Sequence, residues 1–238
     1  MNMSKDYIKC PRLYVDEELI GNAEIIIHDM QAHYLKNVLR KKSGDMVRIF
    51  NGRNGEWIAE IADLSKKKIL IILREKLKEQ SASEYKTHLL FAPIKKNRMD
   101  ILIEKAVELG ATDLHPIITQ NTESRKINED RIRAQIIEAA EQCERLDLPL
   151  LHSSLTLDKL LGDWNKPQTL FVALERSDNA LRLTKPSDHA FILIGPEGGF
   201  TEKEQEQLMA HDAVSTISLG SRVLRAETAA LKALSLLN

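Results

Sequence analysis

A glycine-rich segment in the last quarter of the chain has the composition of a ligand-binding loop. It spans Gly195–Phe200, where three glycines and a proline surround Glu197, and it follows an apolar, strand-like stretch. Such a loop lets the backbone approach a bound group and holds a carboxylate beside it. A tight strand-to-helix turn with a solvated Glu197 fits these residues equally well. The segment is neither the dinucleotide fingerprint nor a phosphate-binding P-loop.

A second segment, Leu219–Ala229, gathers charged residues where the chain is expected to turn from strand to helix. It contains Arg222, Arg225 and Glu227. One interpretation is a solvated helix start, in which Glu227 is favoured by the positive end of the helix dipole. Arg225 argues against it, because a cation near a helix N-terminus is unfavourable and usually has another partner.

Basic residues cluster in a third strand-to-helix loop. Lys95, Lys96 and Arg98 precede the helical stretch that holds Lys105. These cations suit phosphate groups, although a solvated charged face has the same composition. The other titratable residues show no metal-ligand or hydrolase pattern: no His stands in an H-E-x-x-H motif, and only two cysteines occur, far apart in sequence. We therefore expect no metal site and no disulfide.

Charge is unevenly distributed along the 238 residues. The net charge is −1, but residues 1–80 hold 15 Lys and Arg against 12 Asp and Glu, whereas the remainder is acidic. Any contact with RNA should therefore be a local patch to which the N-terminal part contributes. No apolar run is long enough for a membrane span and no signal-peptide core is present, so we expect a cytoplasmic protein without membrane contact.

The elements that must position these residues fall into two groups. Strand-like segments separated by turn dipeptides predict a small, mostly antiparallel β-barrel or sandwich over residues 1–74, with one helix at about 31–41. Polar residues 75–86 are predicted to be a linker. The expected strands of this first group are 12–15, 24–27, 45–50, 56–62 and 69–73.

From residue 87 to 238, strand-like runs alternate with segments of helical spacing. Asn97 and Asn128 are predicted to cap helices ending near Leu109 and Leu146, and Thr201 with Glu204 forms a capping box. A last helix is expected to run through residue 237. This alternation predicts an α/β domain with a mainly parallel sheet covered on both faces. The expected strands are 88–92, 113–118, 169–174, 190–194 and 214–219.

Five segments together carry a family signature: Gln31–Arg40, Lys95–Gly110, Glu138–Pro149, Ile194–Phe200 and Leu219–Ala230. They resemble the RsmE family of 16S ribosomal RNA uridine N3-methyltransferases, which belongs to the SPOUT superfamily. The resemblance spans nearly the whole chain, and the pairing of the last two segments is its most specific part. It implies a PUA-like β-barrel followed by a SPOUT α/β domain with a trefoil knot, a feature that general topology rules would not suggest.

The resemblance also implies a cofactor, partners and roles for particular residues. The cofactor would be S-adenosylmethionine, bent in the knot and held largely by backbone groups of three loops. The substrate would be a uridine in the decoding region of 16S rRNA within the small ribosomal subunit, and the protein would be a homodimer. The implied cofactor-binding residues are Leu174, Ile194, Gly195, Pro196, Gly198, Gly199, Leu219, Gly220, Leu224 and Thr228.

Catalysis would depend on Arg225, which could stabilise negative charge on a uracil carbonyl oxygen as the N3 proton leaves. Glu197 would either orient Arg225 or take that proton. The expected RNA contacts are Arg12, His33, Arg40, Lys95, Arg98 and Lys105, although His33 also fits an ordinary surface residue. Two other functions stay open: methylation of another RNA position by a SPOUT enzyme, and a non-catalytic ribosome- or RNA-binding factor.

Overall fold

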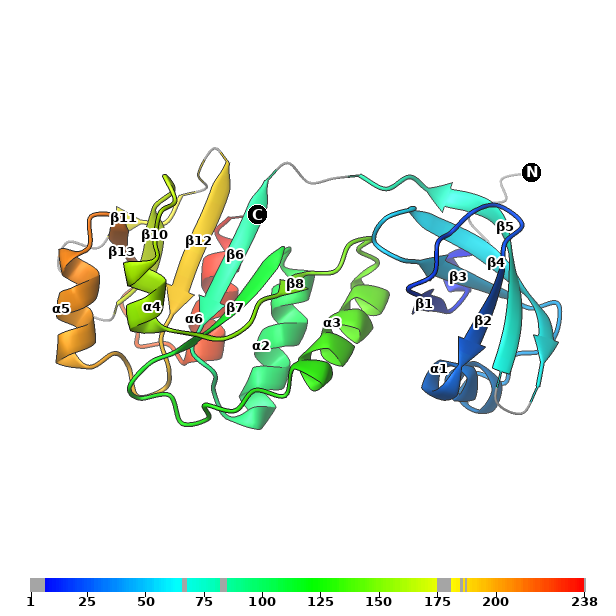
Figure 1. The fold of residues 1–238 in the computed structure, drawn as a ribbon, viewed down its shortest axis with the longest axis horizontal. Helices are drawn as coiled ribbons and strands as arrows, with labels where there is room; N and C mark the ends of the chain where they lie inside the picture. Colours follow the sequence, from blue (N-terminus) through cyan, green and yellow to red (C-terminus); the bar gives the residue numbers. More distant parts are fainter. Residues whose placement is uncertain are drawn as a thin grey trace. The chain divides into compact units, whose positions relative to one another are not determined.

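Five strands near the N-terminus pair into one sheet in the order β1-β3-β4-β5-β2 (Figure 1). β1 runs parallel to β3, and the other neighbours are antiparallel. Each strand overlaps a predicted one, but β5 continues to Lys78 and takes up the first part of the predicted linker 75–86. The strands are β1 (Arg12–Tyr14), β2 (Glu24–His28), β3 (Met46–Phe50), β4 (Glu56–Leu64) and β5 (Lys68–Lys78).

Alternate residues of these strands build the first core. Ile25 and Ile27 on β2 are buried between exposed neighbours, as the two-residue period of a strand requires. Helix α1 (Asp29–His33) continues as a π-helical stretch, Tyr34–Val38. The helix predicted over 31–41 therefore ends earlier, because Arg40 has a φ of +53° that a right-handed helix cannot contain.

A wholly parallel sheet forms the second core, in the order β11-β13-β10-β12-β6-β7-β8, with β9 pairing with β7. The five predicted strands are all present. The two-residue strands β8, β9 and β11 were not predicted, because so short a segment has no periodicity to detect. The bounds are β6 (Lys86–Phe91), β7 (Asp113–Ile118), β8 (Leu150–Leu151), β9 (Leu155–Thr156), β10 (Leu170–Ala173), β11 (Leu181–Arg182), β12 (His189–Ile194) and β13 (Val214–Ser218).

Helices cover both faces of this sheet. On one face, Leu157 of α4 and Leu208 of α5 join a cluster of buried side chains that includes Leu193 of β12. On the other, α6 packs against α2 and against β6 and β12. The helices are α2 (Lys96–Glu108), α3 (Glu129–Cys143), α4 (Leu157–Gly162), α5 (Glu202–Ala210) and α6 (Ala226–Ser235).

Two of the three predicted helix caps are confirmed. Asn128 Oδ1 accepts a hydrogen bond from the backbone N–H of Arg131 at 3.0 Å, and Thr201 with Glu204 forms the full capping box. Asn97 is not a cap, because α2 already begins at residue 96 and the carbonyl of Lys95 accepts the first helical bonds. The third helix stops at Cys143 rather than near Leu146, since Glu144 adopts a left-handed φ of 59°.

The computed structural model describes residues 7–65, 68–81, 85–174, 181–184, 186 and 188–237. The chain divides into two compact units, of which the first comprises Met1–Ala82 with Ala140–Asp147 and the second Ser83–Ala139 with Leu148–Asn238. The end of α3 thus belongs to the first unit, which the sequence did not indicate. Within the described ranges, no helix has the length and apolar character that crossing a membrane requires.

Candidate functional site

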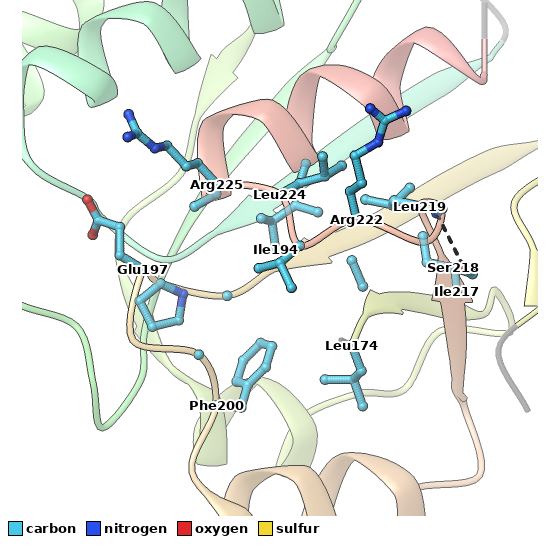
Figure 2. A pocket seen from close by; sticks show the side chains of 18 of the residues that line it. Leu174, Ile194, Glu197, Phe200, Ile217, Ser218, Leu219, Arg222, Leu224 and Arg225 are labelled. Atoms are coloured by element: carbon cyan, nitrogen blue, oxygen red, sulfur yellow. Dashed lines mark hydrogen bonds between the residues drawn. The ribbon is translucent and has the colours of Figure 1, made fainter. Parts of the chain in front are cut away.

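A pocket of about 600 Å³ opens at the carboxyl ends of β10, β12 and β13 in the second unit (Figure 2). Three segments form the described part of it: Ala173 and Leu174 at the end of β10, the glycine-rich Gly195–Phe200 loop after β12, and the segment after β13 that leads into α6. This is where parallel sheets place their ligands. The lining residues are Arg98, Ala173, Leu174, Ile194, Gly195, Pro196, Glu197, Gly199, Phe200, Gln205, Ile217, Ser218, Leu219, Gly220, Ser221, Arg222, Val223, Leu224, Arg225, Ala226 and Ala229.

Two glycines are required by the shape of these loops. A Cβ on Gly195 would lie 2.8 Å from Cε2 of Phe200, so any side chain there would displace the ring. Gly220 has a φ of +108°, a backbone conformation that residues other than glycine rarely adopt. Its N–H donates to Ser218 Oγ at 3.2 Å. Both loops therefore present bare backbone to the pocket.

Apolar side chains form the walls. Figure 2 shows Leu174, Ile194 and Phe200 around the space between the loops, with Leu224 above Ile194. Ile194 and Phe200 are almost fully buried. An apolar, partly enclosed space with backbone polar groups at its edges suits a small ligand that combines flat apolar and hydrogen-bonding parts.

Charged side chains stand at one end of the pocket. Arg98 Nη1 lies 3.3 Å from Glu197 Oε1, and Arg98 Nε lies 3.8 Å from Glu227 Oε1. Glu197 thus pairs with Arg98, and its predicted roles, orienting Arg225 or taking the N3 proton, stay predictions. Arg98 lines the pocket because the first turn of α2 brings it to the glycine-rich loop, and its predicted contact with phosphates stays a prediction.

Arg225 lies at the N-cap position of α6 and lines the pocket with an exposed side chain. In the described part of the chain, no carboxylate forms an ion pair with it. A cation in this position was expected to have a separate partner. An unpaired guanidinium beside a pocket is available to a bound substrate.

Most of the implied cofactor-binding residues meet in this pocket, but two do not. Gly198 turns its carbonyl toward Asn121, whose Nδ2 donates to it at 3.1 Å. Thr228 is exposed on α6, while Ala226 and Ala229, three residues apart, face the pocket. Helical spacing from Arg225 would have identified Ala229. Phe200, Ile217 and other wall residues were missed because wall formation depends on long-range packing.

Arg12 is not an RNA contact. Its guanidinium is buried, with Nε 2.5 Å from Glu56 Oε1 and with Nη1 and Nη2 donating to the carbonyls of Ala140 and Arg145 at 2.6 and 2.7 Å. It also lies 3.6 Å from the centroid of the Phe50 ring. All its donors face the interior of the first unit, so none can reach a phosphate.

The other predicted RNA contacts lie at the surface. His33 and Arg40 are exposed on the first unit. On the second unit, exposed Lys95 has its Nζ 3.5 Å from Glu123 Oε1. Lys105 donates to Glu104 and Glu108 at 2.7 and 2.8 Å, and these hydrogen bonds raise the pKa of its ammonium group. Two carboxylates already balance that charge, which makes Lys105 the weakest of the four as a phosphate contact.

Comparison with known proteins defines the class to which this fold and pocket belong. The model of an RNA methyltransferase domain matches residues 81–238, and that of an RNA methyltransferase PUA domain matches residues 29–74. The chain is thus built as an RNA methyltransferase with a PUA domain.

Relatives that match nearly the whole chain identify the family within this class. Ribosomal RNA small subunit methyltransferase E of Rickettsia conorii is 37% identical over 232 residues, covering 96% of this chain and 95% of its own. The protein of the same name from Synechocystis is 31% identical, with coverages of 99% and 79%. The chain belongs to the ribosomal RNA small subunit methyltransferase E family, which confirms the resemblance.

Solved structures agree with this assignment. The family member of Neisseria gonorrhoeae, bound to S-adenosyl methionine, superposes with a TM-score of 0.82 at 27% identity, covering 94% of this chain and 95% of that one. A Legionella pneumophila protein in complex with the same cofactor gives a TM-score of 0.84 at 31% identity, with coverages of 96% and 97%.

Proposed function

We propose that this chain transfers a methyl group from S-adenosylmethionine to N3 of a uridine in the 16S rRNA of the small ribosomal subunit. The observation that carries the proposal is the pocket between the end of β10, the glycine-rich loop and the segment after β13, with an unpaired Arg225 at its edge. The names of the relatives support ribosomal RNA as substrate, and the cofactor in two similar structures supports the methyl donor.

The residues of the pocket fit this cofactor. The close approach of Gly195 to Phe200 leaves bare backbone where a nucleoside can be hydrogen-bonded, and Leu174, Ile194 and Leu224 offer apolar walls for its base. The volume lies within the usual range of small-molecule sites, about 300–1,000 Å³. When bound, the cofactor supplies a methyl group that its sulfonium already activates, so the protein's task is to prepare the uracil.

Preparing the uracil means removing the N3 proton and stabilising the charge that spreads onto the flanking carbonyl oxygens. Arg225 performs the second task, because its guanidinium can donate to a carbonyl oxygen at the pocket edge. Preorganised donors of this kind often contribute more to catalysis than any other single effect. Glu197 is the carboxylate of the pocket lining and the nearest candidate to accept the proton, while its ion pair with Arg98 fixes its position.

RNA outside the pocket is held through phosphates, by Arg40 and His33 on the first unit and by Lys95 near the start of α2. These side chains are exposed and lie outside buried networks. The cytoplasm, where ribosomal subunits are assembled, is the compartment that this substrate implies.

The trefoil knot and the homodimer are part of the same proposal. The position of β13 between β10 and β11 supports the knot, because the last strand enters the sheet between two earlier ones instead of adding to an edge. The paired knots of the family would bring the pockets of two subunits to one interface.

The test is methyl transfer from labelled S-adenosylmethionine to small-subunit particles from a strain lacking the gene, followed by mapping of the modified nucleotide. We expect one N3-methylated uridine in 16S rRNA. Label at another nucleotide or at a ribose hydroxyl would identify a different RNA methyltransferase. Binding of the particle without binding of S-adenosylmethionine, measured by calorimetry, would identify a non-catalytic RNA-binding factor.

A further inference from the structure

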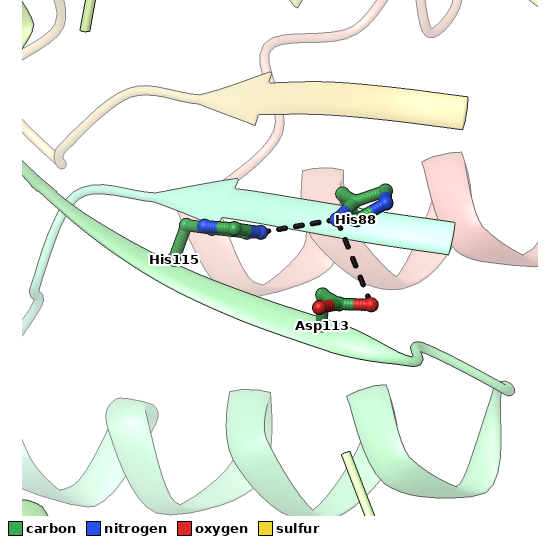
Figure 3. A group of neighbouring side chains, drawn as sticks. All are labelled: His88, Asp113 and His115. Atoms are coloured by element: carbon green, nitrogen blue, oxygen red, sulfur yellow. Dashed lines mark hydrogen bonds and ion pairs between the residues drawn. The ribbon is translucent and has the colours of Figure 1, made fainter. Parts of the chain in front are cut away.

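Histidines that are scattered in the sequence come together on the neighbouring strands β6 and β7, in the amino-terminal half of each strand, whereas the pocket lies at the carboxyl ends of β10, β12 and β13. His88 on β6 pairs in register with Asp113 on β7, and His115 follows two residues later on the same face. One ligand atom from each of the three lies within 4.8 Å of those of the other two (Figure 3). Sequence spacing gave no sign of this group, because its members meet only through strand pairing.

The separations within the group match those of a tetrahedral metal site. His88 Nδ1 lies 3.1 Å from His115 Nε2 and 3.6 Å from Asp113 Oδ2. Zinc-ligand bonds of about 2.0–2.1 Å at tetrahedral angles place neighbouring ligand atoms about 3.3 Å apart. Two facing imidazole nitrogens need either one shared proton or a cation between them, and a metal ion meets the same need.

Neighbouring side chains hold the three ligands in place. The ring of His88 stacks on Phe191 at 4.0 Å between centroids and 7° between planes, and that of His115 stacks on His152 at 3.8 Å and 12°. His152 Nε2 also lies 2.8 Å from Asp113 Oδ1, the oxygen that the group leaves free. Such support of a ligating carboxylate is typical of natural metal sites.

We propose that His88, Asp113 and His115 bind a divalent transition-metal ion, of which Zn²⁺ is the expected one, with water as the fourth ligand. Two imidazoles and one carboxylate suit zinc and exclude a dedicated magnesium or calcium site, whose ligands are oxygens. The Asp113 side chain is 7% exposed and that of His88 12%, whereas His152 is 35% exposed, so the route for the ion passes His152.

The site has a structural role. On β12 (His189–Ile194), Phe191 and Ile194 are three residues apart, which is about 10 Å at about 3.3 Å per residue. Phe191 beside the histidines and Ile194 at the pocket belong to this strand. A metal ion held by these side chains would therefore connect β6 to β7 without contacting the methyl-transfer site.

The experiment titrates chelator-treated, full-length protein with Zn²⁺ and Co²⁺ alone. We expect one ion per chain, a visible Co²⁺ spectrum of tetrahedral type and a thermal midpoint that rises with Zn²⁺ concentration. His115→Gln should abolish the Co²⁺ spectrum. His152→Gln, which changes a partly exposed residue outside the ligand set, should weaken Zn²⁺ binding by about 10- to 100-fold.

The matched control is His28→Gln, an exposed histidine of the first unit, which should bind metal like the unaltered chain. Absence of stoichiometric binding to the unaltered protein would overturn the proposal. Equal binding by the His115→Gln and His28→Gln variants would do the same. Neither outcome involves S-adenosylmethionine, so failure here leaves the proposed methyl transfer unaffected.

Discussion

Arg225 and Arg98 both line the pocket, but among the described residues only Arg98 forms ion pairs with carboxylates. Arg98 is matched by Glu197 and Glu227 within 4 Å, whereas Arg225 has no ion-pair partner within the described ranges. An arginine that is paired with carboxylates helps to hold those side chains in position. An arginine without such a partner can interact electrostatically with a bound substrate. This contrast supports the proposed catalytic role of Arg225, and we propose that Arg98 has a positioning role through Glu197.

Replacing Arg225 by Ala should lower kcat by on the order of a hundredfold or more, the usual loss for one preorganised donor. Affinity for S-adenosylmethionine should stay within about twofold, because the walls and backbone that hold the cofactor are unchanged. Arg225→Lys should recover only part of the rate, since an ammonium lacks the planar fork. Single-turnover methyl transfer and calorimetry measure the two quantities.

Arg133→Ala, an exposed arginine of α3, is the matched control and should react normally. If Arg225→Ala instead weakened the binding of S-adenosylmethionine and left kcat unchanged at saturating cofactor, Arg225 would contribute to cofactor binding and not to catalysis.

Gly195→Ala tests the cofactor pocket itself. The new Cβ would lie 2.8 Å from the Phe200 ring, so the ring must move into the space that the cofactor needs. Overpacking typically costs about 1–3 kcal/mol, which corresponds to a loss in affinity of about 5- to 150-fold. Gly162→Ala is the control, because a Cβ there meets no atom within 4 Å. Equal titration curves for the two variants would contradict the assignment.

At the scale of elements, the start of α5 links local sequence to the pocket. Thr201 Oγ1 accepts from the N–H of Glu204 at 3.3 Å, and Glu204 Oε2 accepts from the N–H of Thr201 at 2.9 Å. Glu204 Oε1 also accepts from the N–H of Gln120 at 2.8 Å. The neighbouring Asn121 donates to the carbonyls of Gly198 and Gly199, so one capping residue supports the glycine-rich loop at a distance.

Two substitutions distinguish the capping role of Thr201 from the additional support that Glu204 gives to residue 120, because they should lower the free energy of unfolding by different amounts. Thr201→Ala should lower the free energy of unfolding by about 1 kcal/mol, the usual value of a cap. Glu204→Ala should cost at least twice as much, about 2–4 kcal/mol, because two part-buried N–H groups lose their acceptor. Urea denaturation of both variants measures the difference. Equal midpoints would mean that the bond to Gln120 contributes nothing.

The sequence predicted these elements better than their contacts. The capping box and every strand of four or more residues could be read from local patterns, because caps and period-two burial are local properties. Helix α4 was missed because its six residues form barely more than one turn. The burial of Arg12 and the meeting of His88 with Asp113 could not be predicted, because their partners lie at least 25 residues away and are found only through folding.

At the scale of the whole molecule, exposed cations on both units should share the binding of RNA. The substitutions Arg40→Gln and Lys95→Gln should each reduce the slope of log affinity against log salt by about 0.7–0.9, the value of one phosphate contact. Filter binding of a 16S rRNA fragment between about 50 and 200 mM salt is a suitable assay. Lys203→Gln, an exposed lysine of α5, serves as the control and should keep the full slope. Unchanged slopes in both test variants would place the RNA elsewhere.

The first unit includes Ala140–Asp147 as well as the N-terminal residues. It therefore cannot be expressed as a single continuous segment of the chain. A fragment ending at residue 82 would keep Arg12 and Glu56 but lose the carbonyls of Ala140 and Arg145 that accept from Arg12. Each buried donor left without an acceptor costs about 1–3 kcal/mol. Heteronuclear NMR should therefore find the fragment poorly folded. Appending residues 140–147 through a flexible linker should restore the chemical-shift dispersion of its amide signals. A fusion protein that is to carry the first unit alone would therefore also have to include residues 140–147, which begin within α3 although the earlier residues of that helix belong to the second unit.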